Sequence, residues 1–273
     1  MLTYRHIARA LNQLGLDCPV IAHTSLASFG DEVRGGAETV VGALLGAFSG
    51  LMMPTFTYRT MIIPETGPEN NGLEYGSTRD ANLMAEFYSP QMPADPMMGA
   101  ASEALRQHPH AHRSMHPILS FAGINVDRAL AAQTIADPLA PIGVLTESQA
   151  CVLLVGVNHT VNSSIHYAEK LAGRKQFLRW ALTHAGVVAC PGWPGTSSGF
   201  QQITPHVEAI TRRVQVGQAE ILAIPLIELI NIAKSLIAAD PLALLPDESD
   251  GDLRARAVRE DVARKSDLTP GFI

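Results

Sequence analysis

Apolar positions near the start of the chain recur in two different patterns. Residues 1–14 place Ile7 and Leu11 on one face at helical spacing, and residues 20–22 form a short apolar run. Helical spacing predicts an amphipathic helix, whereas a short apolar run bounded by turn residues predicts a buried strand. The chain therefore opens with a helix followed by a strand.

Two adjacent glycines introduce the next unit. After Gly35 and Gly36, the apolar residues of the segment 40–48 recur at helical spacing, and a second apolar run covers 51–56. A strand, a glycine-containing loop, a helix and another strand form the repeating unit of a parallel sheet covered by helices.

The region from Tyr58 to Asp95 differs in composition. It is rich in proline, glycine, asparagine and acidic residues. Such a stretch predicts a long loop over the surface, of the kind that often carries binding groups.

Strands and helices continue to alternate in the rest of the chain. The predicted elements are a helix over 100–107, strands over 118–122 and 151–157, a helix beginning near Ile165, a strand over 219–224 and a helix with Pro225 in its first turn. This order is typical of an α/β fold with a mostly parallel sheet. Because no repeat or low-complexity linker is visible, we expect one domain over residues 1–245, followed by a charged tail or surface helix over 246–273.

Composition and charge narrow the classes of partner. The chain has 273 residues, is 47% hydrophobic and carries a formal net charge of −6. This apolar content can fill a substantial core, and the negative charge argues against nucleic acid, whose binding requires a basic face. The same sign would attract a polycation.

The cysteines and the apolar segments bear on location. Cys18, Cys151 and Cys190 are odd in number and widely spaced, which favours a reducing cytoplasm over a disulfide framework. The most apolar stretch, 219–239, contains charged residues and predicts a buried helix rather than a membrane span. The N-terminal segment lacks the pattern of an export signal.

The loop from His23 to Gly36 is the first candidate site. Glycines allow a ligand to approach the main chain, and the free N–H groups at the start of a helix favour a phosphate or pyrophosphate. The loop matches neither the phosphate-binding loop of nucleoside triphosphatases nor the dinucleotide fingerprint. An ordinary turn with a helix cap explains the same residues.

The second candidate lies directly after the predicted strand at 151–157. His166 and Glu169 are three residues apart and share one face of the helix predicted there. A neutral imidazole can take a proton from an attacking nucleophile, and a nearby carboxylate can orient it. A structural histidine beside a solvated glutamate is the alternative.

Four histidines at 108, 110, 112 and 116 suggest zinc at first sight. Two prolines interrupt the run, and no carboxylate or thiolate accompanies it. We therefore expect surface histidines and no metal site.

Taken together, these segments resemble the aminoglycoside 3-N-acetyltransferase family and occur in its order. The similar stretches are His23–Leu26 with Gly35–Gly36, Met53–Tyr58, Glu103–Arg106, Arg113–Pro117 with Ser120–Ala122, and Asn162–Glu169. The resemblance covers roughly residues 20–240. Because five short motifs stand in register, it is more specific than any one of them.

The resemblance implies a three-layer α/β/α fold, distinct from that of the GNAT acetyltransferases. It also implies acetyl-CoA as the donor and direct acetyl transfer to an amine, for this family the 3-amino group of a deoxystreptamine ring, which confers antibiotic resistance. His166 matches the family's catalytic histidine. The coenzyme-binding positions that it implies are Ser25, Leu26, Ala27, Ser28, Val33, Arg34, Gly35, Gly36, Arg113 and Ser114.

This sequence departs from the family pattern at three places. Ser163 replaces a threonine, Ala27 stands where the family is often polar, and the stretch 188–193 lacks the glutamate that orients the histidine. Either Glu169 or Glu208 substitutes, or the histidine works without a carboxylate.

For the acceptor we expect a small polycationic amine. The candidate contacts are Tyr58, Glu65, Glu74, Asp80 and Glu208. Two rival functions remain: a cysteine acyl-enzyme using Cys190 or Cys151, and a non-catalytic protein that binds CoA or a polyamine. The sequence also leaves open another amine as acceptor and a homodimer as the assembly.

Overall fold

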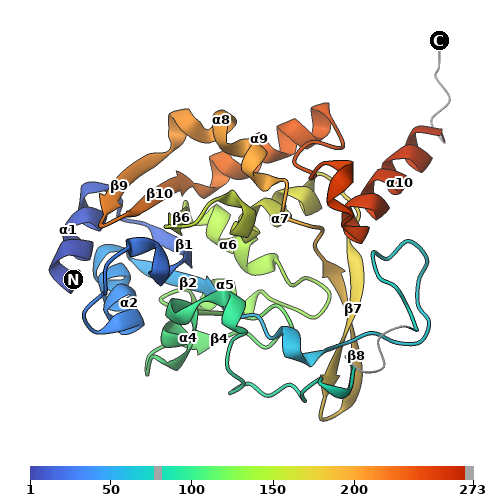
Figure 1. Cartoon of the computed structure of the whole chain (residues 1–273), viewed down its shortest axis with the longest axis horizontal. Helices are drawn as coiled ribbons and strands as arrows, with labels where there is room; N and C mark the ends of the chain where they lie inside the picture. Colours follow the sequence, from blue (N-terminus) through green and yellow to red (C-terminus); the bar gives the residue numbers. More distant parts are fainter. Residues whose placement is uncertain (77–81, 268–273) are drawn as a thin grey trace.

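The computed structural model describes residues 1–76 and 82–267 (Figure 1). Within them, seven strands form the main sheet in the order β4–β5–β2–β1–β6–β10–β9. Their bounds in that order are His112–Arg113, Phe121–Ile124, Gly50–Pro54, Pro19–Thr24, Cys151–Val155, Ala219–Pro225 and Arg212–Val216.

The sheet is parallel at its centre and antiparallel toward its edges. β1 pairs in parallel with β2 and β6, so that Val20 is level with Leu51 on one side and Cys151 on the other. β5 and β10 run antiparallel to the strands beside them. β9 and β10 are joined by Gly217 and Gln218 alone, and so short a connection requires antiparallel strands.

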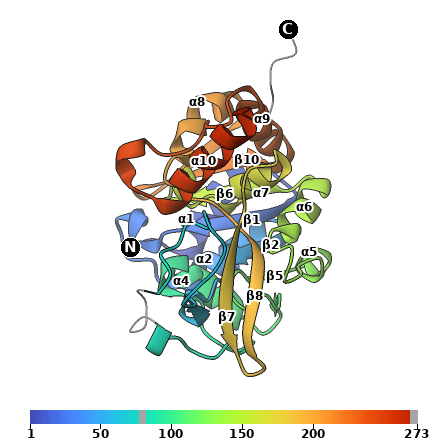
Figure 2. The same ribbon diagram turned by 90° about the vertical axis from the view of Figure 1, so that its right-hand side faces the viewer.

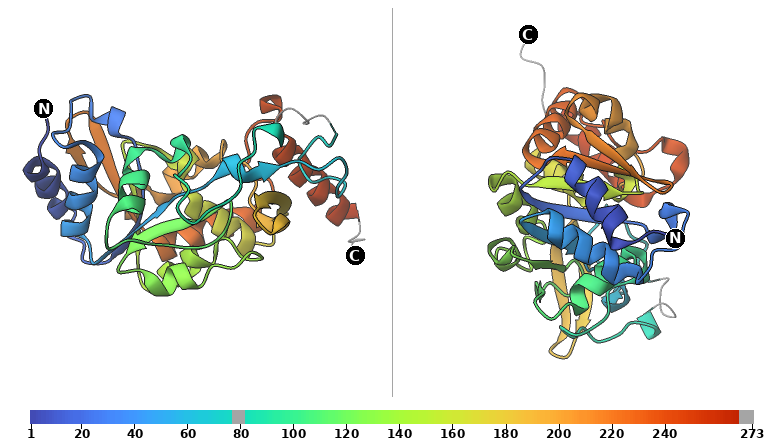
Figure 3. Two further views of the ribbon diagram at one scale, coloured as in Figure 1. Left: turned by 90° about the horizontal axis from the view of Figure 1, so that it is seen from below. Right: turned by 90° about the vertical axis from the view of Figure 1, so that its left-hand side faces the viewer.

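Helices cover both faces of the sheet and complete three layers (Figures 1 and 3). The first layer contains α1 (Tyr4–Gln13), α2 (Gly36–Ala47) and α4 (Ala100–Gln107), and the other contains α5 (Asp127–Ala131), α6 (Ala140–Glu147), α7 (Ser163–Leu171) and α9 (Leu226–Ala239). Neighbours on β1 face opposite ways: Val20 packs into the core of the first layer and Ile21 into the other. The predicted three-layer fold is therefore confirmed.

A second, antiparallel sheet was not predicted from the sequence. Within the described residues it has three strands, β3 (Met61–Ile62), β7 (Phe177–Thr183) and β8 (Gly186–Trp193). The β7–β8 hairpin stands at the end of the molecule opposite α1 (Figures 1 and 2). Arg179 lies on the same buried face of β7 as Phe177 and Ala181, which breaks the apolar–polar alternation that signals a strand.

The segment after residue 245 contains a helix, α10 (Leu253–Asp267). Its small residues Ala255, Ala257 and Val258 are buried, and the last two belong to the core of the α7 and α9 layer. The helix looked polar in sequence because alanines supply much of its buried face. A short helix, α8 (Thr204–Val207), precedes β9.

Two predicted boundaries moved. The strand expected over 118–122 is β5 at Phe121–Ile124, while Ile118 is fully buried in the turn before it. The helix expected near Ile165 begins at Ser163, because the Asn162 side chain accepts the Ser164 N–H and caps it. In the described part of the chain, no helix is long and apolar enough to cross a membrane.

Candidate active site

A cavity of about 850 Å³ opens at the carboxyl ends of the three central strands. His23 and Thr24 end β1, Pro54 ends β2, and Val157 follows β6; all four line it. Ligands in open α/β sheets collect at this edge, so the cavity lies where the fold favours binding.

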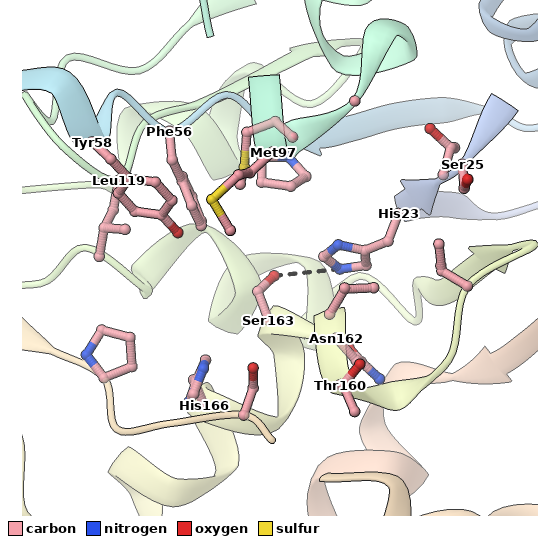
Figure 4. Close-up of a pocket in the computed structure, with 18 of the residues that line it drawn as sticks. His23, Ser25, Phe56, Tyr58, Met97, Leu119, Thr160, Asn162, Ser163 and His166 are labelled. Carbon is pink, nitrogen blue, oxygen red and sulfur yellow. Dashed lines mark hydrogen bonds between the residues drawn. The ribbon is translucent and has the colours of Figure 1, made fainter. Parts of the chain in front are cut away.

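One part of the cavity wall is apolar and another is polar (Figure 4). The large apolar residues are Leu26, Phe56, Tyr58, Met61, Met97, Met98, Leu119, Leu139 and Trp193. The principal polar residues are His23, Thr24, Ser25, Thr160, Asn162, Ser163, His166, Ser197 and Arg254. Among the described residues, no aspartate or glutamate belongs to the lining.

His166 and Glu169 form the pair that the helical spacing predicted. The Nδ1 atom of His166 lies 2.7 Å from Oε2 of Glu169, and the two side chains are 11% and 5% exposed. The ring of Phe200 meets the imidazole edge-on with 4.7 Å between centroids. These contacts fix the orientation of the ring and leave Nε2 for a ligand.

A third residue holds the carboxylate in place. Nη1 of Arg174 donates to Oε1 of Glu169 at 2.7 Å, and Nη2 donates to the carbonyl oxygens of Pro241 and Ala243. Gly173, with φ of +76°, ends the turn after α7, so that Arg174 folds back beside Glu169. An ionised carboxylate in this position accepts the Nδ1 proton, and Nε2 then carries the lone pair that can accept a proton.

Two further histidines close to the cavity are buried and uncharged at neutral pH. The Nε2 atom of His23 is 3.4 Å from the hydroxyl oxygen of Ser163, and the Nδ1 atom of His159 contacts the side-chain amide of Asn162. Burial lowers the pKa of each imidazole to about 4. His159 is not part of the cavity lining, whereas His23 is.

The predicted coenzyme loop divides between two places. Ser25, Leu26 and Ala27 line the cavity, and the Ser28 hydroxyl donates to the Ser25 carbonyl oxygen. The remaining predicted residues lie at the start of α2: Val33 is buried and pairs with Leu2, Arg34 and Gly35 border a separate groove of about 490 Å³, and Gly36 begins the helix.

Arg113 and Ser114 are engaged within the protein. The Arg113 guanidinium donates to the Ser120 hydroxyl and to main-chain carbonyl oxygens, including that of Thr55 at 2.7 Å. The Ser114 hydroxyl bonds both main-chain groups of Phe121. Neither residue lines the cavity, and both hold β5 in register with its neighbours.

A family model described as aminoglycoside 3-N-acetyltransferase matches residues 21–238. The chain belongs to this family. It is 33% identical over 186 residues to aminoglycoside N(3)-acetyltransferase VII of Streptomyces paromomycinus, which covers 63% of this chain and 61% of that protein. It is also 33% identical over 187 residues to aminoglycoside N(3)-acetyltransferase IX of Micromonospora chalcea, with 63% of each covered. The match spans about three fifths of the length of these relatives.

Solved structures of the same fold extend the likeness to nearly the whole chain. Aminoglycoside acetyltransferase AAC(3)-IVa superposes with a TM-score of 0.75 over 95% of this chain and 97% of its own, at 20% identity. The YokD protein of Bacillus subtilis gives 0.73 over 88% and 94%, at 23% identity. At these identities the likeness concerns the fold.

The residues that the sequence predicted to contact the acceptor do not lie together at the cavity. Tyr58 lines the cavity, and burial raises its pKa to about 12. Glu65 and Glu74 are exposed and outside the lining, and Glu208 pairs with Arg213 at 2.7 Å away from it. Asp80 lies outside the described residues. Of the two candidate partners for the histidine, Glu169 is therefore the one in contact.

The cysteines named as rival nucleophiles are remote from this chemistry. Neither Cys151 nor Cys190 lines the cavity, and burial raises the pKa of Cys190 to about 11. The sulfur of Cys151 lies 3.4 Å from that of Cys18. A neutral buried thiol is a poor nucleophile, so the geometry favours a direct mechanism.

Three important residues were missed in the sequence. Arg174 follows α7 after a glycine, a position where a turn can bring an arginine back to the helix, and this signal was available. Trp193 and Arg254 reach the cavity from β8 and α10. No local sequence pattern predicted that Trp193 and Arg254 line the cavity, because only the packing of distant elements brings them to it.

Proposed function

We propose that this chain is an acetyl-CoA-dependent N-acetyltransferase in which His166 is the general base. The observation that carries the proposal is the chain of contacts His166–Glu169–Arg174 at the wall of the cavity. Membership of the family supports the reaction class.

In the proposed reaction the acceptor amine attacks the thioester carbonyl of acetyl-CoA, and Nε2 of His166 takes the proton that the amine loses. The C–S bond then breaks, and the coenzyme leaves as a thiolate that the imidazolium can protonate. Glu169 keeps the imidazole in the tautomer that accepts at Nε2. Both reactants share one cavity, which supplies the advantage of a reaction within one complex.

The residues of the cavity support a place for the donor. Ser25, Leu26 and Ala27 follow β1 and line the cavity, and the buried Thr24 hydroxyl there has no protein partner. We assign the pantetheine end of the coenzyme to this loop and its phosphates to the exposed start of α2, where helix N–H groups and Arg34 favour anions.

Two acceptor classes follow from different observations. The relatives are named for aminoglycosides, and solved structures of this fold contain gentamicin and sisomicin. These names favour the 3-amino group of an aminoglycoside, with antibiotic resistance as the role. The lining formed by residues 1–76 and 82–267 contains no carboxylate, which favours a different amine.

Release of free CoA thiol from acetyl-CoA, measured over a panel of amines, tests the proposed reaction. Amine-dependent release by the parental protein and its loss in His166→Ala are expected, with the exposed His206→Ala as the matched control. A protein that binds CoA but releases no thiol with any amine would be the non-catalytic alternative.

A further inference from the structure

The cavity offers little to a polycation. Apart from the two histidines His166 and His23, Arg254 is the charged side chain that the described residues contribute to the lining, and it is a cation. A buried ammonium group recovers only part of its lost hydration from hydroxyl and amide oxygens, and a carboxylate would compensate that loss more fully. A ligand with several ammonium groups is therefore poorly matched to this wall.

Three carboxylates near the cavity make hydrogen bonds within the protein. Glu169 is held between His166 and Arg174, Asp252 binds Arg254 at 3.0 Å, and Asp95 accepts the N–H of Met97. None of the three lines the cavity.

A second cation lies behind the aromatic part of the wall. The guanidinium carbon of Arg179 is 5.5 Å from the centre of the Trp193 ring, and the residue is 3% exposed. Its hydrogen bonds go to main-chain oxygens of Asn71, Leu178 and Gly72 rather than to a carboxylate. Trp193 thus separates the cavity from a buried positive charge, which repels a further cation.

Arg254 retains capacity for an anion. Its guanidinium donates to Asp252 and to the carbonyl oxygen of Gly195, which uses two of five N–H donors. The side chain is 31% exposed. A carboxylate or similar anion in the cavity can therefore gain charge-assisted hydrogen bonds.

We propose that the acceptor is a monoamine with an apolar body, of the size of an aromatic ring, and one anionic group that meets Arg254. This inference rests on the proposed acetyltransferase function and specifies its substrate class. The amine faces His166, the apolar body packs against Phe56, Tyr58 and Trp193, and the anion lies at the α10 side of the cavity.

Three probes separate the features of the acceptor: L-phenylalanine has the apolar body and the anion, phenethylamine has the body alone, and gentamicin is a polycation. Thiol release from acetyl-CoA gives kcat/KM for each. We expect phenylalanine to exceed phenethylamine by about tenfold, the worth of one charge-assisted hydrogen bond of some 1.4 kcal/mol. Gentamicin should be the poorest acceptor.

Different failures have different meanings. A higher kcat/KM for gentamicin than for both monoamines overturns this inference and leaves the acetyltransferase assignment standing. Equal values for phenylalanine and phenethylamine overturn the role of Arg254. No thiol release with any of the three, while another amine of the panel supports release, overturns this inference alone. No release with any amine overturns the proposed function as well.

Two variants test the charge of the wall. In Arg254→Gln the ratio between phenylalanine and phenethylamine should collapse to about one. Met97 is 81% exposed and also lines the cavity, so that Met97→Glu adds a carboxylate without disturbing the core. It should raise kcat/KM for gentamicin at low salt, and Met97→Gln is its uncharged control. A gentamicin activity that does not respond to Met97→Glu contradicts the proposed electrostatic cause.

Discussion

His166 and Arg174 share one carboxylate, that of Glu169, at 2.7 Å on each of its two oxygen atoms. The arginine is anchored in turn by the main chain at Pro241 and Ala243. The orientation of the proposed base therefore depends on a segment far away in the sequence, beyond the β7–β8 hairpin and α9.

Loss of the imidazole is the first prediction. His166→Ala should lower kcat by roughly 10²–10⁴-fold, the usual contribution of a positioned proton acceptor. Binding of CoA, measured by calorimetry, should change much less, since the coenzyme is assigned to other residues. A folded His166→Ala protein with parental turnover would eliminate the mechanism; His206→Ala should behave as the parent.

Breaking the buried ion pair should destabilise the fold. Arg174→Met leaves Glu169 charged and buried, and we expect the free energy of unfolding to fall by about 3–5 kcal/mol. The double variant Glu169→Gln/Arg174→Met removes both charges and should recover part of that loss. Urea denaturation of Arg174→Met, Glu169→Gln and the double variant measures these differences, and additive effects of the two substitutions would show that the groups do not interact.

Acid should destabilise the fold through its buried histidines. His116 is 3% exposed, so the prediction that it is a surface histidine is wrong. Burial lowers the pKa of His23, His116 and His159 to about 4, from an ordinary value of 6.5. In the unfolded chain these imidazoles therefore become protonated below about pH 6.5, whereas in the folded chain they become protonated only below about pH 4. Stability is complete above this window and falls as the pH drops through it, by up to about 1.4 kcal/mol per pH unit for each histidine.

His116 provides the variant for this effect because it lies outside the cavity lining. Its Nδ1 accepts the N–H groups of Ile118 and Leu119, a role that an asparagine oxygen can take over. In His116→Asn, the urea midpoint should depend less steeply on pH between about 6.5 and 4. An unchanged slope would mean that this imidazole does not resist protonation.

The coenzyme loop can be tested at Ala27. This residue is exposed and lines the cavity, so that Ala27→Trp fills space without disturbing the core. We expect CoA affinity to fall by about tenfold, or 1.4 kcal/mol, in calorimetry, while Ala27→Ser stays near the parent. Full affinity in Ala27→Trp would place the coenzyme elsewhere. Gly35 is a poorer test, because at φ of +80° a side chain there would strain the start of α2.

The C-terminal helix should be required for stability. Ala257 on α10 is 2% exposed, and its carbonyl oxygen accepts a hydrogen bond from Asn70. Ala257→Glu buries an unpaired charge and should cost about 3 kcal/mol or more in unfolding free energy. Arg264→Ala, on the exposed face of the same helix, should cost almost nothing. Equal stability of both variants would show that α10 is loosely held.

Elements with local signals could be predicted from the amino-acid sequence alone. Apolar periodicity placed α1, α2, α4 and the central strands, since a helix or strand with one buried face repeats at about 3.6 or 2 residues. The pair His166–Glu169 was also visible, because residues three apart on a helix must share a face. Both predictions required only neighbours along the chain.

Tertiary structure decided what distant segments contribute to the site. The hairpin β7–β8 was not predicted because Arg179 is buried where an apolar residue was expected. A surface helix was one of the two alternatives for residues 246–273, but the burial of α10 was not predicted because its buried face is largely alanine. Polar composition assigned binding to Glu65 and Glu74, yet a long loop has no period that fixes where its side chains point. The charge of the cavity depends on Arg254 and Arg179, from two elements that meet only when the chain folds, and no local pattern encodes that meeting.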